Sequence, residues 1–162
     1  MKFHVAGFES ESIVDGPGFR YVIFFQGCPH HCDGCQNPNT WSYDENKGFY
    51  IDQDTLIKNI EEDPLITGVT FSGGEPFSQS KNILSLAKEL KEKNYNIWCF
   101  TGYKYKEIQN DPLLDYIDVL VDGEFIKEEK SLDLLFRGSK NQRLIDIKKT
   151  KLTGNIVLWD KV

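Results

Sequence analysis

Short apolar segments alternate with amphipathic segments along most of the chain. Four runs rich in β-branched and aromatic residues predict strands over Tyr21–Phe25, Gly68–Ser72, Asn96–Thr101 and Asp118–Asp122. Strands that recur between helical segments are typical of βα units, in which parallel strands pair side by side and helices pack on the sheet. The pattern therefore predicts an α/β fold with mainly parallel strands.

Helical spacing of apolar residues between these strands predicts helices over Thr55–Glu62 and Ser80–Lys93. The first helix starts near Asp52 or Asp54 and must end before Pro64, because proline cannot continue a helix. A weaker helical pattern over residues 104–116 is interrupted near residues 111–112. The inward faces of the two strong helices consist of these residues: Leu56, Ile57, Ile60, Ile83, Leu84, Leu86, Ala87 and Leu90.

Beyond Gly123 the pattern becomes irregular. The segments RLIDIKK (143–149) and NIVLWD (155–160) alternate as edge or tail strands do. The chain has 162 residues, whereas a complete eight-stranded βα barrel typically needs about 250 residues. Length and pattern together predict a single domain over residues 1–162, built as a partial βα barrel or an open sheet.

Charge and hydropathy narrow the range of partners. The 25 acidic and 19 basic side chains give a net charge of −6, so nucleic acid is not an expected partner. The longest apolar runs, such as Tyr21–Phe25, are far shorter than the roughly 20 residues of a membrane span. The N-terminus MKFHVAGFES lacks the apolar segment of a signal peptide, which predicts a cytoplasmic protein with reduced thiols and no membrane partner.

Three of the four cysteines, Cys28, Cys32 and Cys35, lie within eight residues in a C-x3-C-x2-C pattern. Clustered thiols in a reducing compartment are typical of metal or redox chemistry. Three thiolates are one ligand short of a closed tetrahedral zinc site or a fully ligated 4Fe-4S cluster. Cys99 lies alone inside the apolar run IWCF and is expected in the core.

Two interpretations of this cluster remain open on spacing alone. In one, His30, His31 or His4 completes a structural zinc site, and the protein is a zinc-binding interaction module. In the other, the fourth coordination position is taken by something outside the chain.

Each predicted strand ends in an unusual motif, and ligands of α/β folds bind at the carboxyl ends of strands. The four motifs in chain order are GCPHHCDGC, SGGEP, TGY and DGEF. In the second, Gly73 and Gly74 let the backbone approach a ligand closely, and Glu75 beside them is a further candidate. Tyr103 either contacts a nucleoside or covers the core, and Asp122 either orients a ligand or caps a turn.

A fifth motif, DGPGFR at residues 15–20, lies before the first predicted strand. It lacks the third glycine of the dinucleotide-binding fingerprint and precedes a strand instead of a helix. We therefore interpret it as a turn.

The cysteine pattern followed by GGEP resembles the radical S-adenosylmethionine superfamily. The resemblance implies a partial βα barrel, in which Cys28, Cys32 and Cys35 bind three irons of a 4Fe-4S cluster and S-adenosylmethionine chelates the fourth. It also implies that carbonyls of the glycine loop accept hydrogen bonds from the ammonium of the ligand. The superfamily often has an aromatic residue before the third cysteine, where this chain has Gly34; backbone contacts from Gly34 and Gln36 are expected instead.

The motifs SIVDGPGFR, GCPHHCDGCQNPNTW, SGGEPF, WCFTGY, VLVDGEF and FRGSKNQRLID resemble, in order, the anaerobic ribonucleoside-triphosphate reductase activases, a family of glycyl-radical-enzyme activases. This resemblance implies reductive cleavage of S-adenosylmethionine to a 5′-deoxyadenosyl radical, which abstracts hydrogen from a glycine of the large reductase subunit. It further implies a low-potential electron donor of the flavodoxin or ferredoxin type.

Alternatives within the superfamily are an activase of another glycyl radical enzyme and a small-molecule enzyme such as a deazaguanine synthase. Arg137 and Arg143 either grip carboxylates of a partner or belong to a polar turn.

Overall fold

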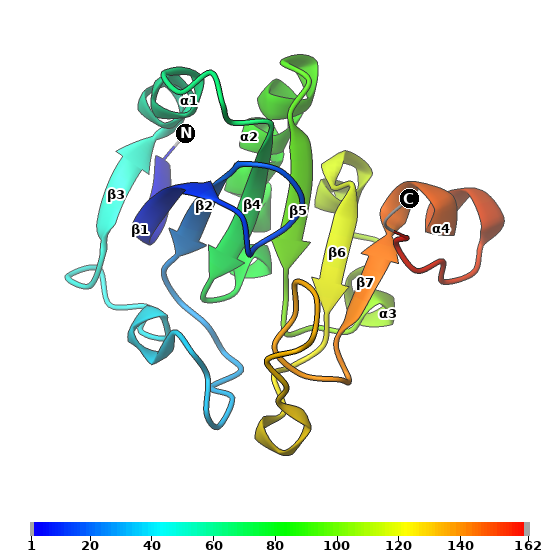
Figure 1. Cartoon of the computed structure of the whole chain (residues 1–162). Coiled ribbons are helices and arrows are strands. Elements are labelled where there is room, and N and C mark those ends of the chain that lie inside the picture. The colour runs from blue at the N-terminus through cyan, green and yellow to red at the C-terminus, as the bar shows by residue number, and fades with distance from the viewer. Residues whose placement is uncertain (1, 161–162) are drawn as a thin grey trace.

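The computed structural model describes residues 2–160, whose strands form a mixed sheet of seven strands. The four predicted strands are present as β2 (Arg20–Phe25), β4 (Gly68–Gly73), β5 (Asn96–Phe100) and β6 (Val119–Asp122). They are adjacent and parallel, which confirms the predicted α/β fold with a mainly parallel centre. Their carboxyl ends all point to the lower edge of the sheet in Figure 1.

Antiparallel strands extend both sides of this centre, in the order β3-β1-β2-β4-β5-β6-β7. They are β1 (Lys2–Ser12), β3 (Phe49–Asp52) and β7 (Arg143–Asp146). Sequence analysis predicts neither β1 nor β3. In β1, buried Phe3 and Val5 alternate with more exposed neighbours, but the register shifts after Val5 and the alternation ends there. β3 is a four-residue edge strand whose side chains are all at least partly exposed, so it has no alternation to detect.

The two strong helix predictions are confirmed by α1 (Gln53–Glu61) and α2 (Ser80–Glu92). All their predicted inward residues are buried except Leu84, which is half-buried. Short 3-10 helices cover Pro38–Thr40, Pro76–Gln79 and Lys127–Glu129. None of the helices within residues 2–160 has the length and apolar character to cross a membrane.

The weaker helix predicted over residues 104–116 is divided into α3 (Tyr105–Ile108) and a 3-10 helix (Pro112–Tyr116). The break occurs because the Asp111 carboxylate accepts a hydrogen bond from the backbone N–H of Leu113 (2.9 Å) and so caps the second helix.

Of the two strand predictions for the C-terminal part, one is confirmed in part and one is wrong. The edge strand expected over RLIDIKK is present as β7, but it ends at Asp146, whose carboxylate accepts a hydrogen bond from the backbone N–H of Lys149 (3.0 Å) and caps α4 (Ile147–Thr153). The segment NIVLWD forms a single bridge between Leu158 and Ile145 in place of a strand.

The sheet has a different apolar cluster on each face. The larger cluster packs α1 and α2 behind the sheet as viewed in Figure 1, and it includes Cys99, as predicted. Alternate residues of the same strands point forward, where Trp98, Val121 and Leu144 form a smaller cluster with Phe136. The front face is therefore covered by loops and the chain terminus instead of helices.

Arg20 fastens the DGPG turn to this front face. Arg20 is 1% exposed, and its guanidinium donates hydrogen bonds to Thr70 Oγ1 (2.8 Å), to the Pro17 carbonyl (3.0 Å), and to the carbonyls of Val69 and Asn96 (3.0 Å each). Burial lowers the pKa of Arg20 to about 10, so it remains charged at neutral pH. The turn predicted at residues 15–18 is thus held against β4 and β5 by the hydrogen bonds of Arg20.

We expect the Arg20→Ala variant to lose about 3 kcal/mol of unfolding free energy, because it leaves a cavity and buried acceptors without donors. Chemical denaturation followed by circular dichroism measures this loss. Lys148→Ala, at an exposed position on α4, is the control and is expected to change stability by less than about 0.5 kcal/mol. Equal stabilities of the two variants would contradict the anchoring role of Arg20.

Candidate functional site

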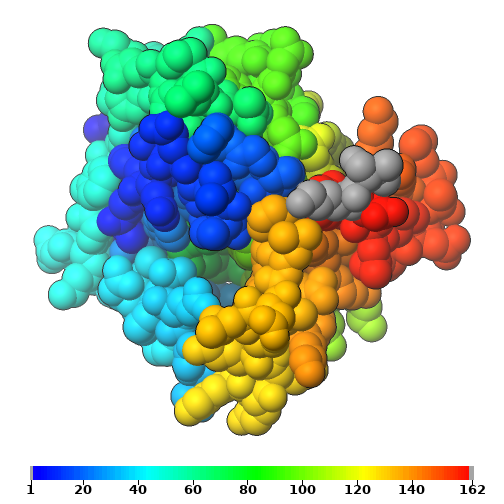
Figure 2. Space-filling model, viewed as in Figure 1, coloured from blue at the N-terminus to red at the C-terminus, as the bar shows by residue number. Residues whose placement is uncertain are grey.

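A cavity of about 360 Å³ opens at the carboxyl ends of β2, β4 and β5. Phe24, Ser72 and Phe100 line it from the front face of the sheet. Other walls come from the loops after β4 and β5 and from three longer segments, which are the turn before β2, the cysteine loop and the segment 123–142. Figure 2 shows the hollow between these three segments, which are coloured blue, cyan, and yellow to orange.

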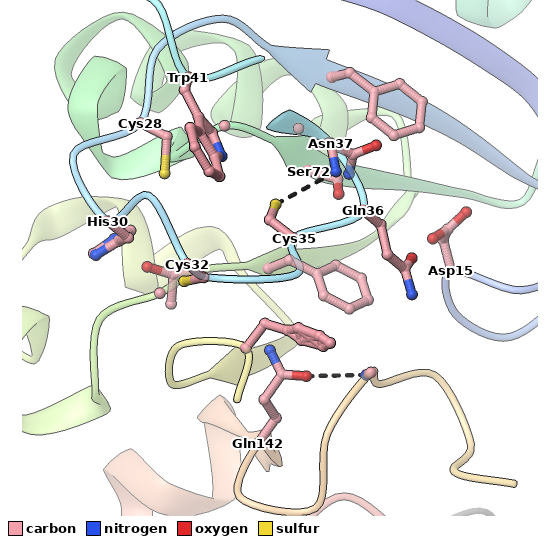
Figure 3. Close-up of a pocket in the computed structure, with 18 of the residues that line it drawn as sticks. Asp15, Cys28, His30, Cys32, Cys35, Gln36, Asn37, Trp41, Ser72 and Gln142 are labelled. Carbon is pink, nitrogen blue, oxygen red and sulfur yellow. Dashed lines mark hydrogen bonds between the residues drawn. The ribbon is translucent and has the colours of Figure 1, made fainter. Parts of the chain in front are cut away.

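Cys28, Cys32 and Cys35 all line this cavity, as Figure 3 shows. The backbone fixes the start of their loop, because the Cys28 N–H donates to the Trp41 carbonyl (3.0 Å). The end of the loop is a turn in which the Cys35 N–H donates to the Cys32 carbonyl (3.1 Å). Within this turn Gly34 has a φ of 77°, a left-handed conformation that glycine adopts without strain.

The surroundings of the thiols are unequal. Burial raises the pKa of Cys28, and burial together with a hydrogen bond to Glu124 raises the pKa of Cys32 to about 11. The Asn37 N–H donates a hydrogen bond to Cys35 Sγ, with 3.4 Å between nitrogen and sulfur. At neutral pH, Cys28 and Cys32 are therefore protonated until a metal displaces their protons.

Within residues 2–160, no three histidine, cysteine or acidic side chains are close enough together to hold one metal ion. The histidines near the cysteines contact other groups. His31 stacks on Trp41 with ring centroids 4.7 Å apart, and His4 Nε2 donates to the Lys47 carbonyl (2.6 Å). His30 hydrogen-bonds to Glu75 (2.7 Å).

Glu75 is fully buried and joins three loops. Its carboxylate accepts hydrogen bonds from His30 Nε2 (2.7 Å), from the Thr101 hydroxyl (2.8 Å), and from the N–H groups of Gly102 (2.8 Å) and Phe77 (3.0 Å). The hydrogen bond to this carboxylate raises the pKa of His30. The Glu75 side chain thereby fixes the positions of the loops after β2, β4 and β5 relative to one another.

Gly73 and Gly74 line the cavity, and both are packed against backbone. Gly73 has a φ of 91°, and a β-carbon there would lie 2.5 Å from the Phe25 nitrogen. A β-carbon on Gly74 would lie 2.9 Å from the Thr40 carbonyl oxygen and would also overlap the Gly27 carbonyl. Glycine is therefore required at residues 73 and 74 because neighbouring backbone of the protein packs against them, whether or not a ligand is bound.

Tyr103 and Asp122 lie next to the cavity without lining it. The ring of Tyr103 packs edge-on against His30, with centroids 4.6 Å apart. Asp122 is 1% exposed and accepts hydrogen bonds from Arg143 Nη2 (2.6 Å) and from the Tyr105 N–H (2.9 Å). Asp122 borders a second cavity of about 1040 Å³, which shares Cys32 and His30 with the first.

Comparisons with known proteins give the family. A family described as a 4Fe-4S single cluster domain matches residues 14–145. The anaerobic ribonucleoside-triphosphate reductase-activating proteins of Vibrio cholerae and Escherichia coli are both 37% identical to this chain over 80% of it, and the matches cover 89% and 90% of those proteins. The protein of that name from Enterobacteria phage T4 is 37% identical over 81% of this chain and 86% of its own length. The chain belongs to the family of anaerobic ribonucleoside-triphosphate reductase-activating proteins.

A solved structure has a similar fold. QueE from Escherichia coli superposes with a TM-score of 0.56 at 20% sequence identity, over 63% of this chain and 53% of that chain. This likeness concerns the fold alone, which this chain shares with QueE over the superposed part.

In this member of the activating-protein family, the predicted site residues fall into two groups. Those on the cavity wall are Cys28, Cys32, Cys35, Gln36, Gly73 and Gly74. Those outside the wall, which contact other parts of the protein, are Gly34, Glu75, Tyr103 and Asp122.

Sequence reasoning missed several wall residues. Alternation along the predicted strands could have identified three of them, Phe24, Ser72 and Phe100. Their strand neighbours belong to the core on one face of the sheet, so these three side chains must point to the other face, where the cavity lies. Trp41 and Gln142 had no such signal, since both lie outside the strands and helices.

Proposed function

We propose that Cys28, Cys32 and Cys35 hold the 4Fe-4S cluster with which this protein activates anaerobic ribonucleoside-triphosphate reductase. The observation that carries the proposal is the convergence of these three thiols and the Gly73–Gly74 loop on one cavity. Three thiolates suit three irons of such a cluster and leave the fourth iron for an exchangeable ligand. The protein is a radical S-adenosylmethionine enzyme, whose cofactors are this cluster and S-adenosylmethionine.

When bound, the cluster supplies one electron that cleaves S-adenosylmethionine into methionine and a 5′-deoxyadenosyl radical, which takes a hydrogen atom from a glycine of the reductase. The residues of this chain bind, orient and shield the reactants. Gln36, Gly73 and Gly74 contact S-adenosylmethionine in our proposal, because they are on the same wall as the thiols. Phe24 and Phe100 add apolar surface to the same cavity, which helps to exclude water from the reactants.

In this proposal, the remaining predicted site residues hold the loops around the cavity in place and do not contact S-adenosylmethionine. Glu75 fixes the three loops, and Tyr103 packs on the histidine that Glu75 binds. Asp122 is held by Arg143, and Gly34 permits the turn between Cys32 and Cys35. For Gly34 and Glu75 this differs from the ligand contact expected from the sequence, whereas for Tyr103 and Asp122 it favours the structural alternative that the sequence left open.

The zinc-binding alternative has less support. Tetrahedral zinc needs four ligands about 2.0–2.3 Å from one centre. His30, His31 and His4 are the histidines that would complete the site, and their rings bind Glu75, stack on Trp41, or bind a backbone carbonyl instead. Cysteines of an iron–sulfur cluster bind separate irons and therefore stand farther apart than the ligands of one ion.

Several broader features complete the proposal. We take residues 1–162 as one domain and the four parallel strands as an incomplete βα barrel of the radical S-adenosylmethionine type. The likeness to QueE supports this architecture. The electron comes from a low-potential donor of the flavodoxin or ferredoxin type, in the cytoplasm, and the target is the large subunit of the reductase.

The proposal is tested by reconstituting activation without oxygen. Reduced protein, S-adenosylmethionine and the large reductase subunit are expected to give a glycine-centred radical in electron paramagnetic resonance, with methionine and 5′-deoxyadenosine as products. Omitting any one component is expected to abolish the radical. If S-adenosylmethionine is cleaved while only a different enzyme or a small molecule is modified, the target assignment fails although the superfamily assignment stands.

A further inference from the structure

Two segments beside the cavity expose large aliphatic side chains. On the turn before β2, Ile13 is 64% and Val14 is 68% exposed. On the hairpin loop 131–138, Leu132 is 90% and Leu135 is 46% exposed. We call Ile13, Val14, Leu132 and Leu135 the apolar rim. Large apolar side chains that are exposed together beside a cavity mark interaction sites more often than single exposed residues do.

The two segments of the apolar rim meet at the cavity. A β-carbon at Gly16 would lie 3.2 Å from the Trp98 ring, and Phe136 packs edge-on against the same ring with centroids 5.3 Å apart. Val14 and Gly138, one from each segment, both line the cavity. In Figure 2 the blue and orange segments border the hollow from two sides.

The exposure of these leucines is not a sign of a loose loop. Lys130 and Ser139 form a bridge at the base of the hairpin. The Gln142 side chain accepts hydrogen bonds from the N–H groups of Gly138 (2.9 Å) and Ser139 (3.1 Å). Phe136 is packed among Trp98 and Trp159. An anchored loop therefore holds Leu132 and Leu135 toward solvent.

We propose that the apolar rim is the surface on which the large subunit of the reductase docks. This inference rests on the proposed function, which requires a glycine of that subunit to enter the cavity, so that the subunit must cover its mouth. The exposed side chains of the apolar rim carry no charge, and Arg143 is already paired with Asp122. Binding is then driven by burial of apolar surface and depends little on ionic strength.

The matched experiment compares two double variants by calorimetry with the purified large subunit, without oxygen. Ile13→Ser with Leu132→Ser changes the apolar rim. Leu65→Ser with Leu152→Ser changes leucines that are 54% and 77% exposed elsewhere, before β4 and on α4. We expect the rim variant to bind about tenfold more weakly and the control variant to stay within about twofold of the wild type.

A second measurement varies salt. The affinity of the wild type is expected to change less than about threefold between about 50 mM and about 500 mM salt. A steep fall with salt would overturn apolar docking, as would equal affinities of the rim and control variants. A change in self-association of the rim variant without a change in reductase binding would also overturn it, because the rim would then contact a second copy of this chain.

Cleavage of S-adenosylmethionine by the protein alone, with a chemical reductant, separates this inference from the proposed function. The rim variant is expected to cleave at the wild-type rate while producing less glycyl radical at limiting concentration. If the wild type does not cleave S-adenosylmethionine at all, the proposed function fails, and the binding measurement still decides whether the rim contacts the subunit.

Discussion

Replacement of Cys28, Cys32 or Cys35 by alanine is expected to abolish binding of the iron–sulfur cluster, whereas Cys99→Ala keeps it. Each of the three thiols lines the cavity, and a cluster already short of one protein ligand does not tolerate the loss of another. Anaerobic reconstitution followed by iron analysis and absorption spectroscopy measures the effect. The wild type is expected to be brown and to hold about four irons per chain.

Cys99 is the matched control because it has the same side chain in a different environment. It is fully buried in the core on the helix side of the sheet, and burial raises its pKa well above the usual value. Its replacement costs about 1 kcal/mol of stability through lost packing and leaves the iron content unchanged. Stoichiometric zinc without iron in the wild type, or loss of iron in Cys99→Ala, would contradict the cluster assignment.

The Gly74→Val variant is expected to lose both the cluster and the affinity for S-adenosylmethionine. A side chain at residue 74 would collide with the backbone of Gly27 and Thr40. The N–H of Gly27 donates to the Thr40 carbonyl (2.6 Å) directly before Cys28, so the displaced backbone is the one that positions the first thiol. Iron analysis after reconstitution and calorimetry with S-adenosylmethionine measure the two losses.

Gly7→Ala is the control for this substitution, because a β-carbon on Gly7 has no neighbour within 4 Å. It is expected to retain the full cluster and normal ligand affinity. A Gly74→Val protein that keeps a full cluster and loses only ligand affinity would contradict this expectation, because the new side chain would then meet the ligand and leave the cysteine loop in place.

The sequence predicts the position of the site well because that position follows from local patterns. Each central strand is a short apolar run, and the motif that follows it must lie at the carboxyl edge of a parallel sheet. The sequence also predicts Cys99 in the core and the turn at residues 15–18, and the structure confirms both.

The contacts between the motifs could not be predicted in this way. Glu75 binds His30, which is 45 residues away in sequence, and Thr101, which is 26 residues away, and no periodicity reports such pairs. The segment 123–142 folds over the cavity without regular alternation, held by side chains such as Gln142. The ion pair between Asp122 and Arg143 forms because β7 pairs antiparallel with β6, and the local sequence pattern does not report which strands pair.

The bonds of Glu75 to three loops have a thermodynamic consequence. A carboxylate that binds His30, Phe77 and Thr101 makes the order of each loop depend on the order of the others. Binding of the cluster orders the cysteine loop, so less conformational entropy remains to be lost when the glycine loop binds S-adenosylmethionine. By thermodynamic linkage, binding of S-adenosylmethionine strengthens cluster binding by the same factor. Amide hydrogen exchange in the loop after β5, which carries no cysteine, should accordingly slow down when iron and sulfide are incorporated into the distant loop after β2.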